Sequence, residues 1–369
     1  MTNGLKRIRI EGFGSLRDVE LSPGQLTVLI GANGSGKSNL LKALRMVALM
    51  RTSALQRFVG EAAGGAAALL HYGPKHTQAI TLQLDFEQAG SSNQYYARLG
   101  YAAGDRLMYL DESVGYRPPN QQDPGMTSLG AGHWESLLRD RAPADPTART
   151  VNDWLSQLTF FHFHDTSMTS ALRTHARAED DQYLRSDGSN LAAFLARLQR
   201  GDDEAEQKAW RRISALVQRV APVVRELLPT PTNGGSVRLD WSDDRDERFG
   251  AHQLSDGTLR AIALITALAQ PTEKLPRFIS IDEPELGLHP AAIGLLAELA
   301  RSVAHRTQVL FATQSTAFLD HFEPAEVVVV ERDNAQTRLH RPDPKTLDGW
   351  LEDYSLSDIF NKGVIGGRP

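Results

Sequence analysis

Apolar and polar residues alternate strictly along several short stretches of the first third of the chain. Residues 78–86 show this pattern, and residues 94–101 and 106–112 continue it. Alternation with a period of two is typical of a strand that is buried on one face only. We therefore expect these stretches to form an antiparallel sheet.

Other stretches are apolar at most positions, without alternation. Residues 26–30, 278–282 and 308–312 are short continuous runs that end at polar or turn-forming residues. Such runs are typical of strands buried on both faces, as in the parallel part of an α/β sheet. Residues 236–241 form a further expected strand.

Helical spacing of apolar residues dominates the middle of the chain. Residues 39–50, 189–200, 204–228 and 261–270 carry apolar positions three and four apart, which predicts helices. Residues 115–150 are instead rich in Pro, Gly, Asp and Gln. We interpret them as a long irregular excursion.

The apolar strand at residues 26–30 runs directly into a glycine-rich loop, GANGSGKS, and then into the helix. Strand, loop and helix in this order are the context of a phosphate-binding loop, whose glycines let backbone N–H groups surround a phosphate. Lys37 is expected to reach the β- and γ-phosphates, and the Ser38 hydroxyl to ligate Mg²⁺. The residues predicted to contact nucleotide here are Gly31, Ala32, Asn33, Gly34, Ser35, Gly36, Lys37, Ser38 and Asn39.

A second motif ends the strand at residues 278–282. The sequence reads FISIDEP, so two carboxylates stand at its carboxyl end. Asp282 is the expected second protein ligand of Mg²⁺, directly or through water. Glu283 is the expected residue that orients or deprotonates the attacking water.

A third motif, LSDGTLR at residues 254–260, precedes the helix at 261–270. Ser255 and Asp256 are favoured helix caps, and Gly257 exposes backbone at the same helix start, which makes an anion site. Plain capping without a ligand is the simpler interpretation of the motif alone. Its place shortly before the DEP strand resembles that of the signature sequence in ATP-binding cassette ATPases, and this resemblance implies a nucleotide contact.

These motifs together give the chain a family resemblance. Five stretches carry it: GANGSGKSNLL, LSDGTLR, IDEPELGLHP, VLFATQS and the opening LKRIRIEGFGSLRDVEL. They resemble the motifs of ABC-type ATPases of the RecF/SMC-like group. Within that group, the chain is similar to bacterial AAA family ATPases related to the ATPase part of OLD nucleases. The resemblance implies an α/β fold: a P-loop NTPase head of ABC type, with a mixed sheet flanked by helices, an antiparallel β subdomain and an inserted, mainly helical lobe. It also implies a homodimer in which LSDGT of one protomer contacts the γ-phosphate of ATP held by the other.

Two positions depart from the ABC pattern. His289 stands where transporter ATPases usually carry an aspartate, which argues against a transporter. Gln314 stands where many ABC enzymes carry a histidine that contacts the γ-phosphate; we expect Gln314 in the catalytic site. Glutamine can donate a hydrogen bond but cannot carry the proton, so slow hydrolysis or an ATP-gated scaffold with little hydrolysis stays open.

Histidines and arginines in the middle of the chain offer further candidates. His162, His164 and Asp165 could face one metal ion, although a structural strand is the favoured interpretation. The arginines Arg173, Arg177 and Arg185 are candidates for phosphate contacts. They are interleaved with acids, which favours a solvated, salt-bridged face.

Composition limits the chemistry and the partners that the chain can have. The chain has 369 residues, no cysteine and a formal net charge of −5, so disulfides and thiolate chemistry are excluded and any DNA contact must come from a local patch. No apolar run reaches the length of a membrane span, and no secretory signal is evident. We expect a cytoplasmic protein without a membrane partner.

The predicted organisation is a split head. Residues 1–114 supply its first half, 115–235 the inserted irregular and helical lobe, and 236–369 the second half with signature, DEP strand and switch. The resemblance implies ATP binding and hydrolysis, with Mg²⁺ as cofactor and ATP-dependent head dimerisation coupled to DNA transactions in repair. The alternative is the ATPase subunit of an anti-phage defence complex, acting with a separate nuclease or effector chain, since no acidic nuclease constellation follows Asp358.

Overall fold

The computed structural model describes residues 3–347 and 349–367. It divides into two compact units, each of which is described by itself. Unit 1 takes in the described residues up to Thr159, together with Arg277–Ser280 and those from Gln308 onward. Unit 2 takes in Phe160–Pro276 and Ile281–Thr307. The predicted three-segment division at 114 and 235 stays a prediction, since these units have their boundaries elsewhere.

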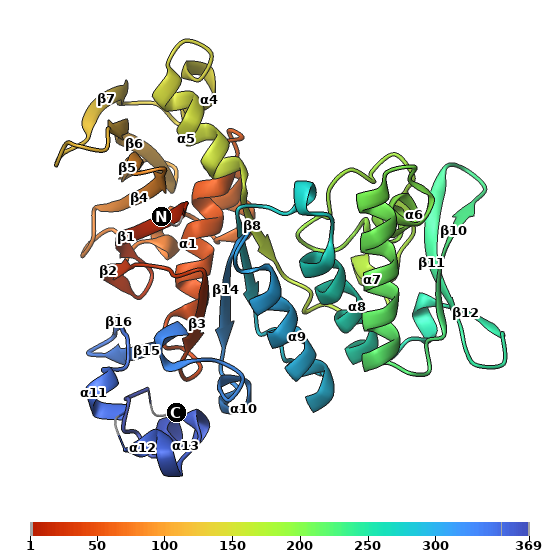
Figure 1. Cartoon of the computed structure of the whole chain (residues 1–369). Coiled ribbons are helices and arrows are strands. Elements are labelled where there is room, and N and C mark those ends of the chain that lie inside the picture. Colours follow the sequence, from red (N-terminus) through yellow and green to blue (C-terminus); the bar gives the residue numbers. More distant parts are fainter. Residues whose placement is uncertain (1–2, 348, 368–369) are drawn as a thin grey trace. The chain divides into compact units, whose positions relative to one another are not determined.

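Unit 1 contains a six-stranded antiparallel sheet, drawn in red to yellow in Figure 1. Its order is β2 (Leu16–Leu21), β1 (Gly4–Phe13), β4 (Ala79–Gln88), β5 (Ser91–Ala102), β6 (Arg106–Arg117) and β7 (Gly125–Gly130). The apolar positions of β4 are fully buried while their neighbours are half-exposed. The alternation therefore predicted this sheet correctly, because one face packs on the core and the other meets water.

A second six-stranded sheet is mixed. Its order is β16 (Gln336–His340), β15 (Val327–Asp333), β3 (Leu26–Ile30), β14 (Gln308–Thr313), β13 (Phe278–Asp282) and β8 (Leu158–Phe161). β3 runs parallel to both β14 and β15, and β15 pairs with β16 in the antiparallel sense. All five residues of β3 are buried, which explains its continuous apolar run. The predicted mixed sheet and antiparallel subdomain are confirmed.

The irregular excursion predicted for residues 115–150 is wrong. This stretch contains the end of β6, all of β7, helix α4 (Leu138–Arg141) and the first turn of α5 (Pro146–Ser156). The Glu112 carboxylate, fully buried, accepts hydrogen bonds from the Ser136 hydroxyl and the Leu137 amide. This buried anchor orders the connection between β7 and α4.

Helix α5 has a start signal that the composition concealed. Asp145 caps it by accepting from two backbone amides, and Pro146 takes its first turn, a favoured arrangement. Its Trp154 stacks on Phe86 of β4, with ring centroids 5.3 Å apart. The helix thereby covers the antiparallel sheet.

The long helix of unit 1 is α1 (Lys37–Met50), which follows β3. Shorter helical segments are α2 (Leu55–Arg57), α3 (Ala66–Leu69), α10 (Thr316–Leu319), α11 (Pro344–Leu347), α12 (Trp350–Asp353) and α13 (Leu356–Asn361). In Figure 1, α11 to α13 lie together near the C-terminal end of the drawn chain.

Unit 2 is built mainly from helices. They are α6 (Leu191–Arg200), α7 (Glu204–Val220), α8 (Asp256–Ala269) and α9 (Pro290–Val303). α7 packs on both α6 and α8. A small sheet of β10 (Glu226–Thr232), β11 (Ser236–Ser242), β12 (Arg248–Gly250) and β9 (Ala176–Arg177) completes the unit.

The helix predicted over residues 204–228 is too long. It ends at Val220, and residues 226–232 form the edge strand β10. Pro222 follows the helix end, where a proline cannot continue the hydrogen-bond pattern. Pro229 and Pro231 are tolerated in β10 because an edge strand leaves amide positions unpaired.

Among the described residues, no helix combines the length and the apolar character needed to cross a bilayer.

Candidate active site

The glycine-rich loop leaves β3 between two neighbouring strands of unit 1. Ile30 pairs with Thr313 of β14 on one side and with Val329 of β15 on the other. A Cβ atom on Gly31 would lie 2.1 Å from the Val330 carbonyl oxygen. Only glycine fits here, so packing of the backbone fixes the point at which the loop begins.

Two further glycines are needed for their backbone angles. Gly34 has φ +76° and Gly36 has φ +116°, conformations that L side chains rarely adopt. Gly36 is the residue before α1, a helix of 14 residues. The loop therefore ends with the amide-rich end of a long helix, where an anion is stabilised.

Lys37 is held against the loop that precedes it. Its ammonium donates to the carbonyl oxygens of Gly31 at 2.6 Å and Ala32 at 3.0 Å. The side chain is buried, whereas Ser38, the next residue, is exposed. The loop thus keeps one cation at its centre and presents one hydroxyl outward.

The donor set fits a nucleotide phosphate with its magnesium ion. The Ser35 hydroxyl is buried inside the loop with no hydrogen-bond partner among the residues that the structure describes, and such orphaned groups are rare without a ligand. Asn33 and Gly34 are exposed at the loop tip. This cradle is compatible with the predicted ATP and Mg²⁺, which stay predictions.

A chain of hydroxyl groups supports the loop from behind. Asn39 donates to the Ser15 hydroxyl at 2.9 Å, and the Ser15 and Thr337 hydroxyls lie 2.7 Å apart. Thr337 donates to the Ser35 carbonyl at 2.8 Å, so Ser15 must donate to Thr337. β16 and the β1–β2 turn therefore fix the loop, a role that nothing in the sequence pattern revealed.

Replacing Thr337 by valine tests this support. The change keeps the shape but leaves the buried Ser35 carbonyl and Ser15 hydroxyl without their partner, which costs about 1–3 kcal/mol. We expect KM for ATP to rise several-fold while kcat changes less. The measurement is steady-state ATP turnover; Thr337→Ser, which keeps the hydroxyl, should behave as wild type, and equal effects of both variants would contradict the role.

Gln314 is placed beside the same loop. It follows Thr313, the partner of Ile30, so the register brings it next to Gly31 at the carboxyl ends of β14 and β3. The residue is exposed. Its position within unit 1 is compatible with the predicted phosphate contact, which stays a prediction.

The two acids of the DEP motif belong to unit 2. Asp282 is the last residue of β13, and both acids are half-buried. Glu283 has φ +43°, an uncommon backbone conformation for a non-glycine residue. Strain of this kind is typical of functional sites, and it directs the chain from the strand into the turn at 283–286, where the Leu286 amide donates to the Glu283 carbonyl at 3.2 Å.

The LSDGT motif begins helix α8. Ser255 caps the helix, and its hydroxyl accepts from the Thr258 amide at 3.2 Å. Ser255 and Asp256 are both exposed. Ser255 is therefore a helix cap, and Ser255 and Asp256 also remain accessible to a ligand or to a second copy of the chain.

Gly257 has a packing reason of its own. A Cβ on Gly257 would lie 2.2 Å from the Gly287 carbonyl oxygen, so the start of α8 rests directly on the segment that follows Glu283. Arg260 reinforces this contact: its guanidinium donates to the carbonyls of Leu286, of Phe163 at 2.9 Å and of His164 at 2.8 Å. Burial lowers the pKa of the Arg260 side chain, and the charges of Asp256 and Glu283 oppose that shift.

Arg173 holds the other side of the motif. Its guanidinium donates to the carbonyls of Ala251, of Leu254 at 3.1 Å and of Thr166 at 2.8 Å, and it pairs with Asp256 at 2.7 Å. The side chain is only 5% exposed. The expected solvated, salt-bridged face is therefore wrong for Arg173, which positions the signature, whereas Arg185 pairs with Asp180 as expected.

Arg173→Ala removes three hydrogen bonds to residues 251–256 and one to Thr166. We expect faster amide hydrogen exchange across residues 251–258 and at least about tenfold slower ATP turnover, because the signature loses its fixed geometry. The affinity with which the P-loop of a single Arg173→Ala chain binds nucleotide should stay unchanged. Arg177→Ala is the matched control, since Arg177 is exposed; unchanged exchange in Arg173→Ala would contradict this role.

The histidines at 162 and 164 do not form a metal centre. In the described part of the chain, no group of three or more His, Asp or Glu side chains is arranged to hold a metal ion. The main chain of this segment instead accepts hydrogen bonds from Arg260. The favoured interpretation of a structural strand near the nucleotide is wrong for these residues, because strand β8 ends at Phe161, before His162. His289 caps α9 by accepting from the Ala291 amide at 3.3 Å.

The phosphate loop, the DEP strand and a signature at a helix start define a P-loop ATPase of ABC type. Residues 26–320 match the family described as "AAA domain, putative AbiEii toxin, Type IV TA system". The match covers most of the chain, so the protein belongs to this family.

Two curated relatives point to the same group. The chain is 24% identical to the OLD nuclease of Thermus scotoductus over 400 aligned residues, which cover 99% of this chain and 68% of the relative. It is 29% identical to the Old nuclease of Escherichia phage P2 over 171 residues, which cover 43% of this chain and 28% of the relative. The protein is thus an ATPase related to OLD nucleases.

Solved structures agree on the fold. An SMC head bound to the C-terminal winged-helix domain of ScpA matches with a TM-score of 0.61 at 14% identity, covering 92% of this chain and 98% of that one. The Smc head of Pyrococcus furiosus matches with a TM-score of 0.57 at 15% identity, covering 95% and 99%. The predicted RecF/SMC-like head is confirmed as the fold.

Proposed function

We propose that two copies of the chain hydrolyse ATP at shared sites. The P-loop of one copy holds the nucleotide, and Ser255, Asp256 and Gly257 of the other complete the site. The observation that carries this proposal is the signature itself: its polar residues are exposed at a helix start that Arg173 and Arg260 hold in place. A rigid, outward-facing anion site suits a phosphate held by another molecule.

Within each site the residues have separate roles. Lys37 and the loop amides stabilise charge on the phosphates, and Glu283 orients the attacking water. Ser38 and Asp282 would hold Mg²⁺, which would offset charge on the phosphate oxygens. Gln314 donates a hydrogen bond toward the γ-phosphate.

We further propose that closure of the two heads is coupled to DNA, as in a repair ATPase of the cytoplasm. The test is ATP turnover by the purified chain with and without single- and double-stranded DNA, with Lys37→Ala as the blank. Stimulation by DNA of at least about fivefold would support the coupling, whereas turnover that is indifferent to both DNA forms would remove it.

A second candidate is an ATPase that acts with a separate nuclease or effector chain in anti-phage defence. The curated relatives are named as nucleases, which favours a nuclease-associated role. A third candidate, an ATP-gated scaffold with little hydrolysis, rests on Gln314. The variant Gln314→His distinguishes this candidate from the two ATPase candidates. A large gain in turnover would indicate that glutamine keeps hydrolysis slow.

A further inference from the structure

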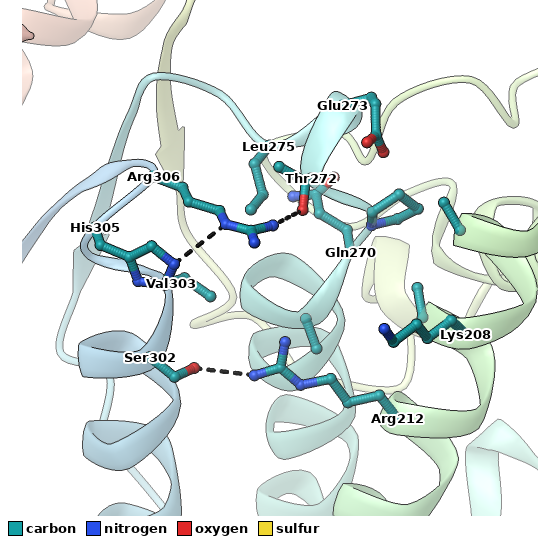
Figure 2. A pocket seen from close by; sticks show the side chains of 14 residues that line it. Lys208, Arg212, Gln270, Thr272, Glu273, Leu275, Ser302, Val303, His305 and Arg306 are labelled. Carbon is teal, nitrogen blue, oxygen red and sulfur yellow. Dashed lines mark hydrogen bonds between the residues drawn. The ribbon is translucent and has the colours of Figure 1, made fainter.

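A polar cavity lies within unit 2, and none of its lining residues belongs to the signature; Figure 2 draws these side chains. It has a volume of about 380 Å³. Its walls come from α7, from the segment after α8 and from the end of α9. We call it the basic pocket, defined by Lys208, Arg212, Gln270, Thr272, Ser302 and Arg306.

The pocket gathers positive charge without matching negative charge. Lys208 and Arg212 stand one turn apart on α7, and Arg306 faces them from beyond α9. Among the described residues, none of the three has an ion-pair partner. Glu273 is the one acid of the 14 lining residues that Figure 2 draws. The pocket therefore carries a net positive charge.

The partners of these arginines are hydroxyl groups. Arg212 donates to the Ser302 hydroxyl at 2.9 Å, and Arg306 donates to the Thr272 hydroxyl. Arg306 also donates to the His305 ring at 3.2 Å, which requires a neutral imidazole. The guanidinium groups are oriented by neutral partners and keep their charge for another ligand.

Other cationic side chains of unit 2 do have an acidic partner. Arg197 and Lys274 both pair with the buried Glu206, at 2.8 Å and 3.2 Å. Lys208 and Arg212 have no such acid, although like charges four residues apart on a helix repel. Arg212 and Arg306 also donate to side-chain hydroxyls and not to the last carbonyls of α8 or α9, so capping of helix ends does not explain them.

We infer that the basic pocket binds a phosphate-bearing ligand. Guanidinium and ammonium groups with nearby hydroxyl donors match phosphate oxygens. The phosphate can come from a free polyphosphate or from the backbone of a polynucleotide. The inference does not rest on the proposed function, since the pocket shares no residue with the predicted ATP site.

The test uses the full chain with Lys37→Ala as background, which weakens phosphate binding at the P-loop. Two probes are measured at several salt concentrations: tripolyphosphate by calorimetry and a labelled single-stranded oligonucleotide by fluorescence anisotropy. The test variant adds Lys208→Ala and Arg212→Ala. The matched control adds Arg211→Ala and Arg219→Ala, which remove the same charge from exposed positions of α7 outside the pocket.

We expect the test variant to bind at least one probe about tenfold more weakly, with the control unchanged. For the oligonucleotide, the slope of log affinity against log salt should fall by about 1–2 in the test variant. Loss for tripolyphosphate alone assigns a free polyphosphate; loss for both probes assigns a polynucleotide backbone. No measurable binding of either probe to the background chain, or equal effects of test and control variants, would overturn the inference. Circular dichroism of each variant confirms that it is folded.

Discussion

Lys37→Ala should abolish productive ATP binding. Lys37 is the cation at the centre of the P-loop, and its ammonium lies 2.6 Å from the carbonyl oxygen of Gly31. Without it, no side-chain charge of the loop offsets the negative β- and γ-phosphates. We expect kcat/KM for ATP to fall by at least about 100-fold. Steady-state turnover and equilibrium binding of a fluorescent ATP analogue measure the effect.

The matched control is Arg45→Ala, which removes one positive charge from an exposed position of the same helix. It should keep wild-type turnover. Because Lys37 also stabilises the loop, circular dichroism must show that Lys37→Ala is folded. Retained ATP affinity in folded Lys37→Ala would contradict the assignment of the loop.

Glu283→Gln should separate binding from hydrolysis. The amide keeps the shape of the side chain but cannot accept the proton of the attacking water, so turnover should fall by about 100-fold or more. ATP binding should be retained. If closure of two heads depends on bound ATP, this variant should accumulate as a closed dimer, visible as a doubled mass by light scattering.

The control for this change is Glu298→Gln on α9, where the carboxylate is exposed and has only a long contact of 3.8 Å to Arg219. It should hydrolyse ATP normally and show no trapped dimer. Unchanged hydrolysis in Glu283→Gln would remove Glu283 from the catalytic role. Lost hydrolysis without an ATP-dependent dimer would keep the catalytic role but contradict the shared site.

The phosphate loop and the DEP strand were readable from sequence because their chemistry is local. Gly31, Gly36 and Lys37 act within a few residues of one another, and the strand before them is continuous and apolar. A pattern of this kind determines both the backbone path and the charged group that it holds. The fold class followed from the same motifs and is confirmed.

The residues that position the signature could not be found in this way. Arg173 reaches carbonyls some 80 positions further along the chain, at Ala251 and Leu254, and its acidic neighbours in sequence suggested a surface instead. Thr337 supports Ser35 across 302 positions. Contacts of such range depend on tertiary packing, which charge patterns along a single chain do not encode.

The missed elements have local causes that composition obscured. The start of α5 at Asp145 and Pro146 is a good helix signal, but it lies in a stretch dominated by turn-forming residues. The sequence pattern did not predict the end of α7 before Pro222, because apolar residues continue at helical spacing beyond that proline. In both cases single capping or breaking residues outweigh average composition.

The central claim is that each ATP site is shared between two copies, and mixing two inactive variants tests it most directly. Lys37→Ala lacks the P-loop cation, and Ser255→Arg blocks the signature; each should be inactive alone. Mixed in equal amounts, they should recover about a quarter of wild-type turnover, since about half of the pairs combine both variants and each such pair keeps one intact site. No recovery on mixing, or full activity of Ser255→Arg alone, would contradict the shared site.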